Sequence, residues 1–244
     1  MSKTIYASNK KTRTVVAVGV FAALAYILTF FFRFRLAFLT FDLKDAVMTI
    51  CGMLFGPLYG AIIAVLVPLL EMIISSTGLY GFVMNALASV TFVWVGSFIY
   101  THDRTMRGAL VGMLSSVLSM NGVMQLANFL ITPGYLELMA PSMIPAGMSA
   151  RTFVGTLLLP LILPFNVTKG VFNASLVFLF YKPISQAVRK AGFDYVLVMN
   201  GGKTEGNRYS RRTGVAVTVI AAVVAVATLL IFFVVLGGSF KTFG

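Results

Sequence analysis

The sequence has few charged residues for its length, and this scarcity excludes a soluble protein. Of its 244 residues, 11% are charged and 59% are hydrophobic. Soluble domains carry about 25% charged and roughly 45–50% apolar residues. Too few charged side chains are present to cover a water-facing surface, so most of the chain must face lipid.

Cysteine and histidine occur once each. One cysteine excludes a disulfide framework and a multi-cysteine metal site. One histidine excludes a zinc site built on a histidine pair, and no Ser–His or carboxylate–metal arrangement is present. Gly202-Lys203-Thr204 resembles the end of a P-loop, but Leu197 stands where the motif needs its first glycine. We therefore expect no enzyme activity, no catalytic residues, no metal and no cofactor.

Apolar runs divide the chain into seven expected membrane segments. They cover residues 14–32, 46–56, 57–76, 80–100, 108–131, 153–181 and 213–236. The second is short for a full span, so we expect it to be tilted or partly re-entrant. Pro68 is expected to kink or break the third segment, and Pro160 and Pro164 to break the sixth. Ala23-Leu24-Ala25 resembles a signal-peptide cleavage site, but the apolar run continues past it, so we expect a retained anchor.

The positive charges fix the expected orientation. The formal net charge is +12, from nineteen Lys and Arg against seven Asp and Glu. With the N-terminus inside, thirteen of the nineteen fall in cytoplasmic segments and Lys169 lies within a span. The five outer ones are Arg33, Arg35, Lys44, Arg151 and Lys241. Basic residues favour the cytoplasmic side, so the charge is a topology signal, and we expect no nucleic-acid partner.

Polar residues form stripes on three of the expected helices. Their spacing of three, four or seven places the members of each stripe on one helix face. The stripes are Asn85 and Ser89; Asn121, Gln125 and Asn128; and Asn166, Lys169 and Asn173. Each could serve interhelical hydrogen bonding, at about 0.6–2 kcal/mol per contact, or line a ligand cavity.

Lys169 fits the structural explanation less well, because a lysine at the bilayer centre costs about 2.5–3.5 kcal/mol. Its candidate acidic partner within a span is Glu71, so either it pairs with Glu71 or it meets a polar ligand in a cavity. Amides and an ammonium present donors and acceptors that suit a neutral heterocycle. They do not suit a metal ion, which prefers carboxylates, thiolates or imidazoles.

Two further patterns lie near the start of the chain. Asp42 and Asp45 are three apart, and we expect them to cap the second segment rather than to catalyse a reaction. Gly19 and Ala23 are four apart, with Ala22 beside them. Such small residues permit close helix approach, either inside the protein or to another membrane protein.

Three blocks of residues resemble the S-components of energy-coupling factor (ECF) vitamin transporters, most of all the riboflavin-binding branch. They are LTFDLKD (39–45) with the FGPLYG turn (55–60), VMNALAS (83–89) and LPFNVTKG (163–170). The third block is the most specific. The resemblance covers residues 14–190 and implies an all-α integral membrane protein. It implies a six-helix S-component bundle with both ends cytoplasmic, to which this chain adds a C-terminal transmembrane helix.

The resemblance also implies site residues and partners. Riboflavin would be bound from outside, beneath the loop between the first two segments. The implied substrate-binding residues are Leu39, Thr40, Asp42, Asn85, Asn128, Asn166 and Lys169, with Phe38, Phe41 and Phe165 as apolar walls. Gly19, Ala22 and Ala23 would dock a transmembrane T-component, and two cytoplasmic ATPase subunits would supply energy. The protein itself would be multi-pass in the bacterial plasma membrane.

Two departures from the riboflavin branch leave alternatives open. Val67-Pro68 replaces a Lys-Asn pair on the third helix, and the last segment has no counterpart in the usual fold. We divide the chain into a membrane domain (1–190), a polar cytoplasmic linker (191–212), and a further transmembrane helix with its tail (213–244). The alternatives are an S-component for folate, pantothenate, pyridoxine or a flavin phosphate, or a membrane anchor that transports nothing.

Overall fold

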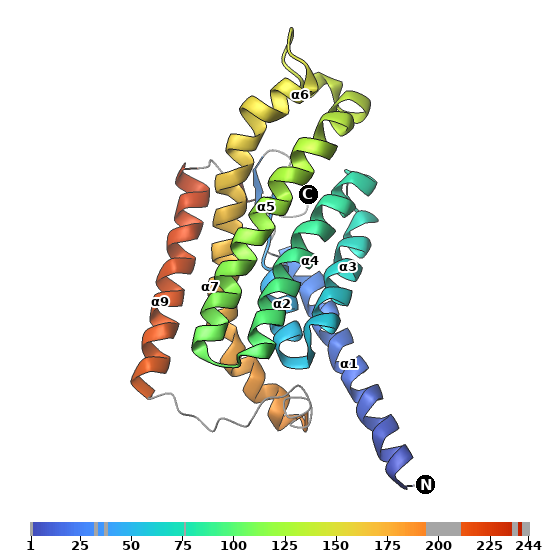
Figure 1. Cartoon of the computed structure of the whole chain (residues 1–244), viewed down its shortest axis with the longest axis vertical. Helices are drawn as coiled ribbons and strands as arrows, with labels where there is room; N and C mark the ends of the chain where they lie inside the picture. Colours follow the sequence, from blue (N-terminus) through green and yellow to red (C-terminus); the bar gives the residue numbers. More distant parts are fainter. Residues whose placement is uncertain are drawn as a thin grey trace.

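The chain forms a bundle of long helices with very little sheet (Figure 1). This computed structural model describes the backbone of residues 2–31, 34–36, 39–75, 77–193, 211–235 and 239–240, and the side chains of 11–31, 41–75, 77–193 and 215–235. The helices are α1 (Ser2–Phe31), α2 (Lys44–Phe55), α3 (Pro57–Met72), α4 (Gly78–His102), α5 (Met106–Met139), α6 (Ala150–Phe153), α7 (Leu159–Lys190) and α9 (Arg211–Leu230). The strands are β1 (Phe34–Leu36), β2 (Leu39–Phe41) and β3 (Ser239–Phe240).

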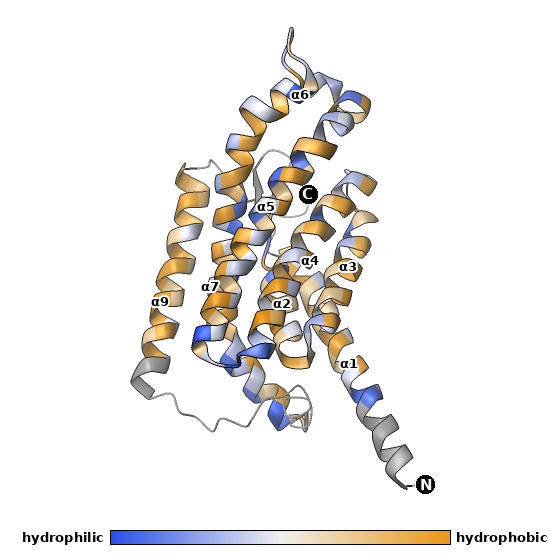
Figure 2. Cartoon of the chain, viewed as in Figure 1, coloured by the Kyte–Doolittle hydropathy of each residue, from blue (hydrophilic) through white to orange (hydrophobic). Residues whose placement is uncertain are grey.

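The expected membrane bundle is confirmed. Within the described residues, five helical stretches are long and apolar enough to cross a membrane. They are Lys11–Phe31, Gly78–His102, Met106–Met139, Ala150–Lys190 and Val215–Val235, and α3 is a shorter apolar helix. Figure 2 shows hydrophobic residues along most of their length.

Helix α2 lies at the centre of the bundle, and every one of its residues is buried. It packs against α1, α3, α4 and α7. Its 12 residues rise by about 18 Å, which is less than the roughly 30 Å of a hydrocarbon core. The expectation of a short second segment is therefore confirmed.

The FGPLYG turn separates α2 from α3 as expected. Gly56 adopts φ 116°, which favours glycine, and Pro57 starts α3, where a missing N–H costs nothing. Gly52 and Gly60 then let the two helices approach closely, because a Cβ on Gly60 would lie 2.8 Å from the Gly52 Cα.

The prolines do not break these helices: the break expected in the sixth segment is wrong, and of the two outcomes expected at Pro68, a break does not occur. Helix α3 continues through Pro68 to Met72, and α7 continues through Pro164. A π-helical segment, Val154–Leu158, joins α6 to α7 just before Pro160. A wider helical turn of this kind absorbs the missing proline N–H without ending the helix.

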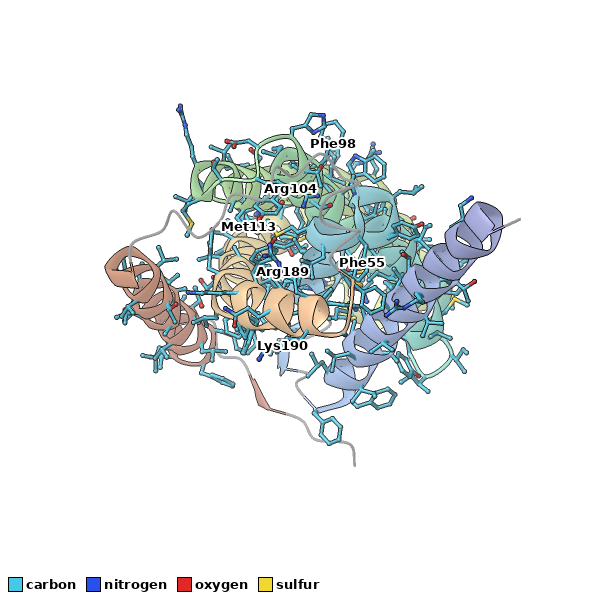
Figure 3. The ribbon with its side chains drawn as sticks, turned by 90° about the horizontal axis from the view of Figure 1, so that it is seen from below. Phe55, Phe98, Arg104, Met113, Arg189 and Lys190 are labelled. Carbon is cyan, nitrogen blue, oxygen red and sulfur yellow. The ribbon has the colours of Figure 1, made fainter. Side chains whose placement is uncertain are left out.

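A small sheet in the first connection was not foreseen by the all-helical expectation. Strands β1 and β2 form an antiparallel hairpin, and β3 pairs with the other edge of β1. The extra helix α9 packs along α7, on the side of the bundle away from α1 (Figures 1 and 3). The C-terminal extension therefore reaches back to the loop that follows α1.

Candidate functional site

A cavity lies between α3, α4, α5 and α7, toward the end of the bundle where α3 connects to α4. Its volume is about 130 Å³. Its polar lining consists of Glu71, Ser75, Thr77, Tyr80, Asn85, Asn128, Tyr135, Asn166 and Lys169. Four of these side chains, Asn85, Asn128, Asn166 and Lys169, belong to the predicted substrate-binding set. Three polar stripes therefore converge on one space.

Glu71 of α3 is the acidic member of this lining, and four hydrogen bonds hold its buried carboxylate. The Lys44 ammonium donates to both oxygens at 2.7 Å. Thr29 donates to Oε1 at 3.0 Å, and Asn85 Nδ2 donates to Oε2 at 2.8 Å. Lys44 is fully buried at the start of α2, so it is part of the bundle interior.

Lys169 of α7 pairs with two carboxylates at the start of α2, Asp42 just before the helix and Asp45 in its first turn. Its Nζ donates to Asp42 Oδ2 at 3.2 Å and lies 3.6 Å from Asp45 Oδ2. Asp45 also accepts from Ser89 Oγ at 2.6 Å. The direct contacts of Lys169 are thus to Asp42 and Asp45, while Glu71 binds Lys44, which corrects the suggested Lys169–Glu71 pair.

The aspartates do not cap α2 with their side chains, contrary to expectation. The N-cap residue is Leu43, and it makes no side-chain cap bond. Instead Asn173 of α7 accepts from the Ala46 backbone N–H at 3.0 Å and donates to the Asp42 carbonyl at 3.0 Å. The third member of the α7 stripe therefore satisfies backbone groups at the start of α2, which leaves both carboxylates to bind lysine.

Asn128 begins a hydrogen-bonded chain that ends in an aromatic pair. Thr132 donates to Asn128 Oδ1 at 2.9 Å, and the Tyr80 hydroxyl lies 2.8 Å from Thr132 Oγ1. The Tyr80 and Tyr135 rings stack with centroids 3.9 Å apart and planes 11° from parallel. Both rings line the cavity. They add a flat apolar wall beside the amides.

Asn166 is an amide of the cavity lining with an open donor. It is 5% exposed and lines the cavity. Within the described part of the chain, its Nδ2 is buried without a hydrogen-bond partner. An unpaired buried donor costs about 1–3 kcal/mol, so this position favours a ligand that accepts a hydrogen bond.

The other predicted residues have varied positions. Asp42 does not line the cavity but reaches it through Lys169. The backbones of Leu39 and Thr40 belong to β2, and their side chains, like Phe38, lie outside the described residues. Phe165 lines the cavity, and Phe41 packs against it with centroids 6.2 Å apart. On α1, Gly19 and Ala23 are exposed and Ala22 is half-buried.

Sequence reasoning missed the roles of Lys44, Tyr80 and Tyr135. Lys44 stands next to a predicted helix start, where a charge in a loop is the ordinary interpretation. The two tyrosines lie near helix ends, which is typical of membrane-interface residues. Tyr80 contacts Thr132 and Tyr135, which lie 52 and 55 residues further along the chain. Contacts over such a distance leave no local pattern in the sequence from which they could be predicted.

Comparison with known proteins identifies the family. The ECF transporter substrate-specific component family matches residues 13–181, and the chain belongs to that family. It is a multi-pass membrane protein and a transporter subunit that binds substrate, not an enzyme. The resemblance drawn from the three sequence blocks is confirmed.

Individual relatives are more distant. The riboflavin transporter RibU of Staphylococcus aureus (strain TCH60) is 24% identical over 186 residues, covering 74% of this chain and 95% of RibU. The riboflavin transporter FmnP of Bacillus subtilis (strain 168) is 27% identical over 192 residues, covering 74% and 98%. A solved S component of a bacterial ECF transporter matches 73% of this chain and 99% of its own, with a TM-score of 0.58 at 24% identity. That structural likeness supports the fold.

Proposed function

We propose that this protein binds riboflavin in the cavity between α3, α4, α5 and α7 and passes it inward. The open donor of Asn166 beside Asn85, Asn128 and Lys169 is the observation that carries the proposal. The pyrimidine edge of a flavin alternates hydrogen-bond donors and acceptors, which amides can match. The stacked Tyr80–Tyr135 pair offers an aromatic surface for the ring system. Two riboflavin transporters among the relatives support the same substrate.

The charges of the site favour the neutral vitamin over its phosphate. Lys169 is the cation among the described lining residues, and two carboxylates already balance it. Arg151, the outer arginine with a described side chain, lies over the Phe129 ring instead. A phosphate group prefers several converging cations, so riboflavin fits this lining better than a flavin phosphate.

Delivery requires partners that supply energy. We propose that a T-component docks on the exposed face of α1, where Gly19 and Ala23 lie beside Val16 and Val20. Two cytoplasmic ATPase subunits would drive the cycle, since the chain carries no nucleotide motif. Small residues on an exposed membrane helix permit the close backbone approach that such docking needs.

The distribution of basic residues supports a cytoplasmic N-terminus. Arg13 Nη2 donates to the Ala191 carbonyl at 3.0 Å, so the start of α1 meets the end of α7. Figure 3 shows Arg104, Arg189 and Lys190 at that same end. Basic residues favour the cytoplasmic side. The cavity, at the opposite end, would then open outward.

Riboflavin titration of the detergent-purified protein tests this proposal. Flavin fluorescence should be quenched on binding to the wild-type protein. Asn166→Leu should weaken binding about 2–10-fold, because it removes a hydrogen bond between neutral groups worth about 0.5–1.5 kcal/mol. The matched control is Asn121→Leu, which changes a buried asparagine outside the cavity lining and should bind normally.

Lys169→Met gives a second arm, with Lys182→Met as its control because Lys182 is exposed on the same helix. We expect Lys169→Met to lose binding and Lys182→Met to keep it. A wild-type protein that leaves riboflavin fluorescence unchanged contradicts the substrate. Folate, pantothenate and pyridoxine would then be titrated in the same way.

A further inference from the structure

Helix α9 and its π-helical end present an unusual burial pattern. Most of its large side chains are exposed, among them Val215, Val219, Val223 and Val226. Phe232 differs, because it is fully buried. It lies in the segment Ile231–Val235, where the helix widens to π geometry. Such segments are frequent at functional sites, and here the wide turn directs one ring into the bundle.

The Phe232 ring joins the aromatic cluster next to the cavity. Its centroid lies 4.7 Å from Phe41 and 6.2 Å from Phe165. Phe41 is the last residue of β2 and precedes Asp42, whose carboxylate binds Lys169. Phe165 lines the cavity and precedes Asn166. Phe232 therefore touches both the loop and the helix that carry the proposed site.

The extension makes a second contact with the same loop. Strand β3 pairs antiparallel with β1, with Phe34 opposite Phe240 and Arg35 opposite Ser239. Strand β1 in turn pairs with β2. The loop between α1 and α2 is thus fixed to the C-terminal extension by backbone pairing at one edge and by the Phe232 ring at its end.

From these contacts we propose that the C-terminal extension is a latch and that Phe232 is a positioning residue for the substrate site. By packing on Phe41, Phe232 holds the end of β2 in place and keeps Asp42 against Lys169, which lines the cavity. The cavity volume of about 130 Å³ is smaller than the roughly 300–1,000 Å³ of most ligand pockets. A larger substrate requires Lys169 and the other lining residues to move, and the latch resists that movement, so it slows both entry and release.

Hydrogen exchange of the ligand-free full-length protein tests the latch independently of any substrate. Phe232→Ala should speed exchange of the backbone amides of residues 34–41 by about tenfold, the effect of losing a pair of aromatic contacts. Val234→Ala is the matched control, because Val234 lies in the same π-helical segment and is 77% exposed. Phe232→Leu, which keeps apolar volume without a ring, should give an intermediate rate and covers the case in which Phe232→Ala does not fold.

The second readout rests on the proposed function. Riboflavin release, followed by stopped-flow fluorescence, should be about tenfold faster in Phe232→Ala and unchanged in Val234→Ala. Unchanged exchange in both Phe232 variants overturns the latch, whatever the substrate. Equal acceleration in the Val234 control also overturns it, because the effect would be general loosening. Faster exchange in a protein that binds no riboflavin supports the latch and contradicts the substrate.

Discussion

Replacing Lys44 by methionine tests how far buried charge pairs stabilise the bundle. Lys44 Nζ lies 2.7 Å from Glu71 Oε2, and both side chains are buried. At an effective dielectric constant of about 20, two unit charges at that distance attract by about 6 kcal/mol. Desolvation offsets part of this, and removing one partner of a buried pair usually costs about 3–5 kcal/mol. We expect a loss of that size for Lys44→Met.

The charge of the whole cluster explains why the loss should be large. The wild-type cluster places Lys44 and Lys169 against Asp42, Asp45 and Glu71. Without Lys44, one ammonium faces three carboxylates in a buried site. A double variant with Glu71→Gln should recover part of the loss, since the amide oxygen can still accept from Asn85 and carries no charge.

Thermal unfolding in detergent, followed by the fluorescence of Trp94, measures the effect. Lys182→Met removes a lysine from an exposed position on α7 and should leave the unfolding temperature unchanged. An unfolding temperature for Lys44→Met equal to that of the wild type would refute the reasoning. A double variant less stable than Lys44→Met alone would also refute it.

Two further substitutions test packing and backbone satisfaction by the same assay. Gly60→Ala should destabilise by about 1–3 kcal/mol, because its Cβ would meet the Gly52 backbone at 2.8 Å. Gly122→Ala is the control, because no neighbouring atom lies within 4 Å of the new Cβ, and it should stabilise by up to about 1 kcal/mol. If Gly60→Ala and Gly122→Ala changed the stability equally, the close approach of α2 and α3 would be contradicted. Asn173→Leu removes two hydrogen bonds to buried backbone groups, the Ala46 N–H and the Asp42 carbonyl, and should cost about 1–3 kcal/mol. A stable Asn173→Leu protein would show that those two bonds contribute little.

The sequence predicts the helices well because each depends on a local property. Apolar runs of sufficient length give α1, α4, α5 and α9, and the Gly56-Pro57 step ends α2 and starts α3. The helix continuity at Pro68 could not be predicted in this way. It depends on neighbouring helices that stabilise α3 through the position where its own hydrogen bond is missing.

The site is predictable where its residues share a helix face. Asn166 and Lys169 meet Asn128 and Asn85 in one cavity because each stripe faces the bundle interior. The pairing of charges is not predictable, because it depends on the path of the β1–β2 loop. That path brings Asp42 to Lys169 and places Lys44 against Glu71. The contact between Phe232 and Phe41 is also not predictable from a local sequence pattern, because the two residues lie far apart in the chain.

The central claim, that the cavity holds riboflavin, is tested most directly by an absorbance spectrum of the purified protein. We expect flavin bands at about one equivalent per chain, because a buried ligand held by several hydrogen bonds leaves slowly. Mass spectrometry of the released ligand should then identify riboflavin rather than its phosphate. A colourless protein that also fails to quench added riboflavin would contradict the account and leave only the fold and the family standing.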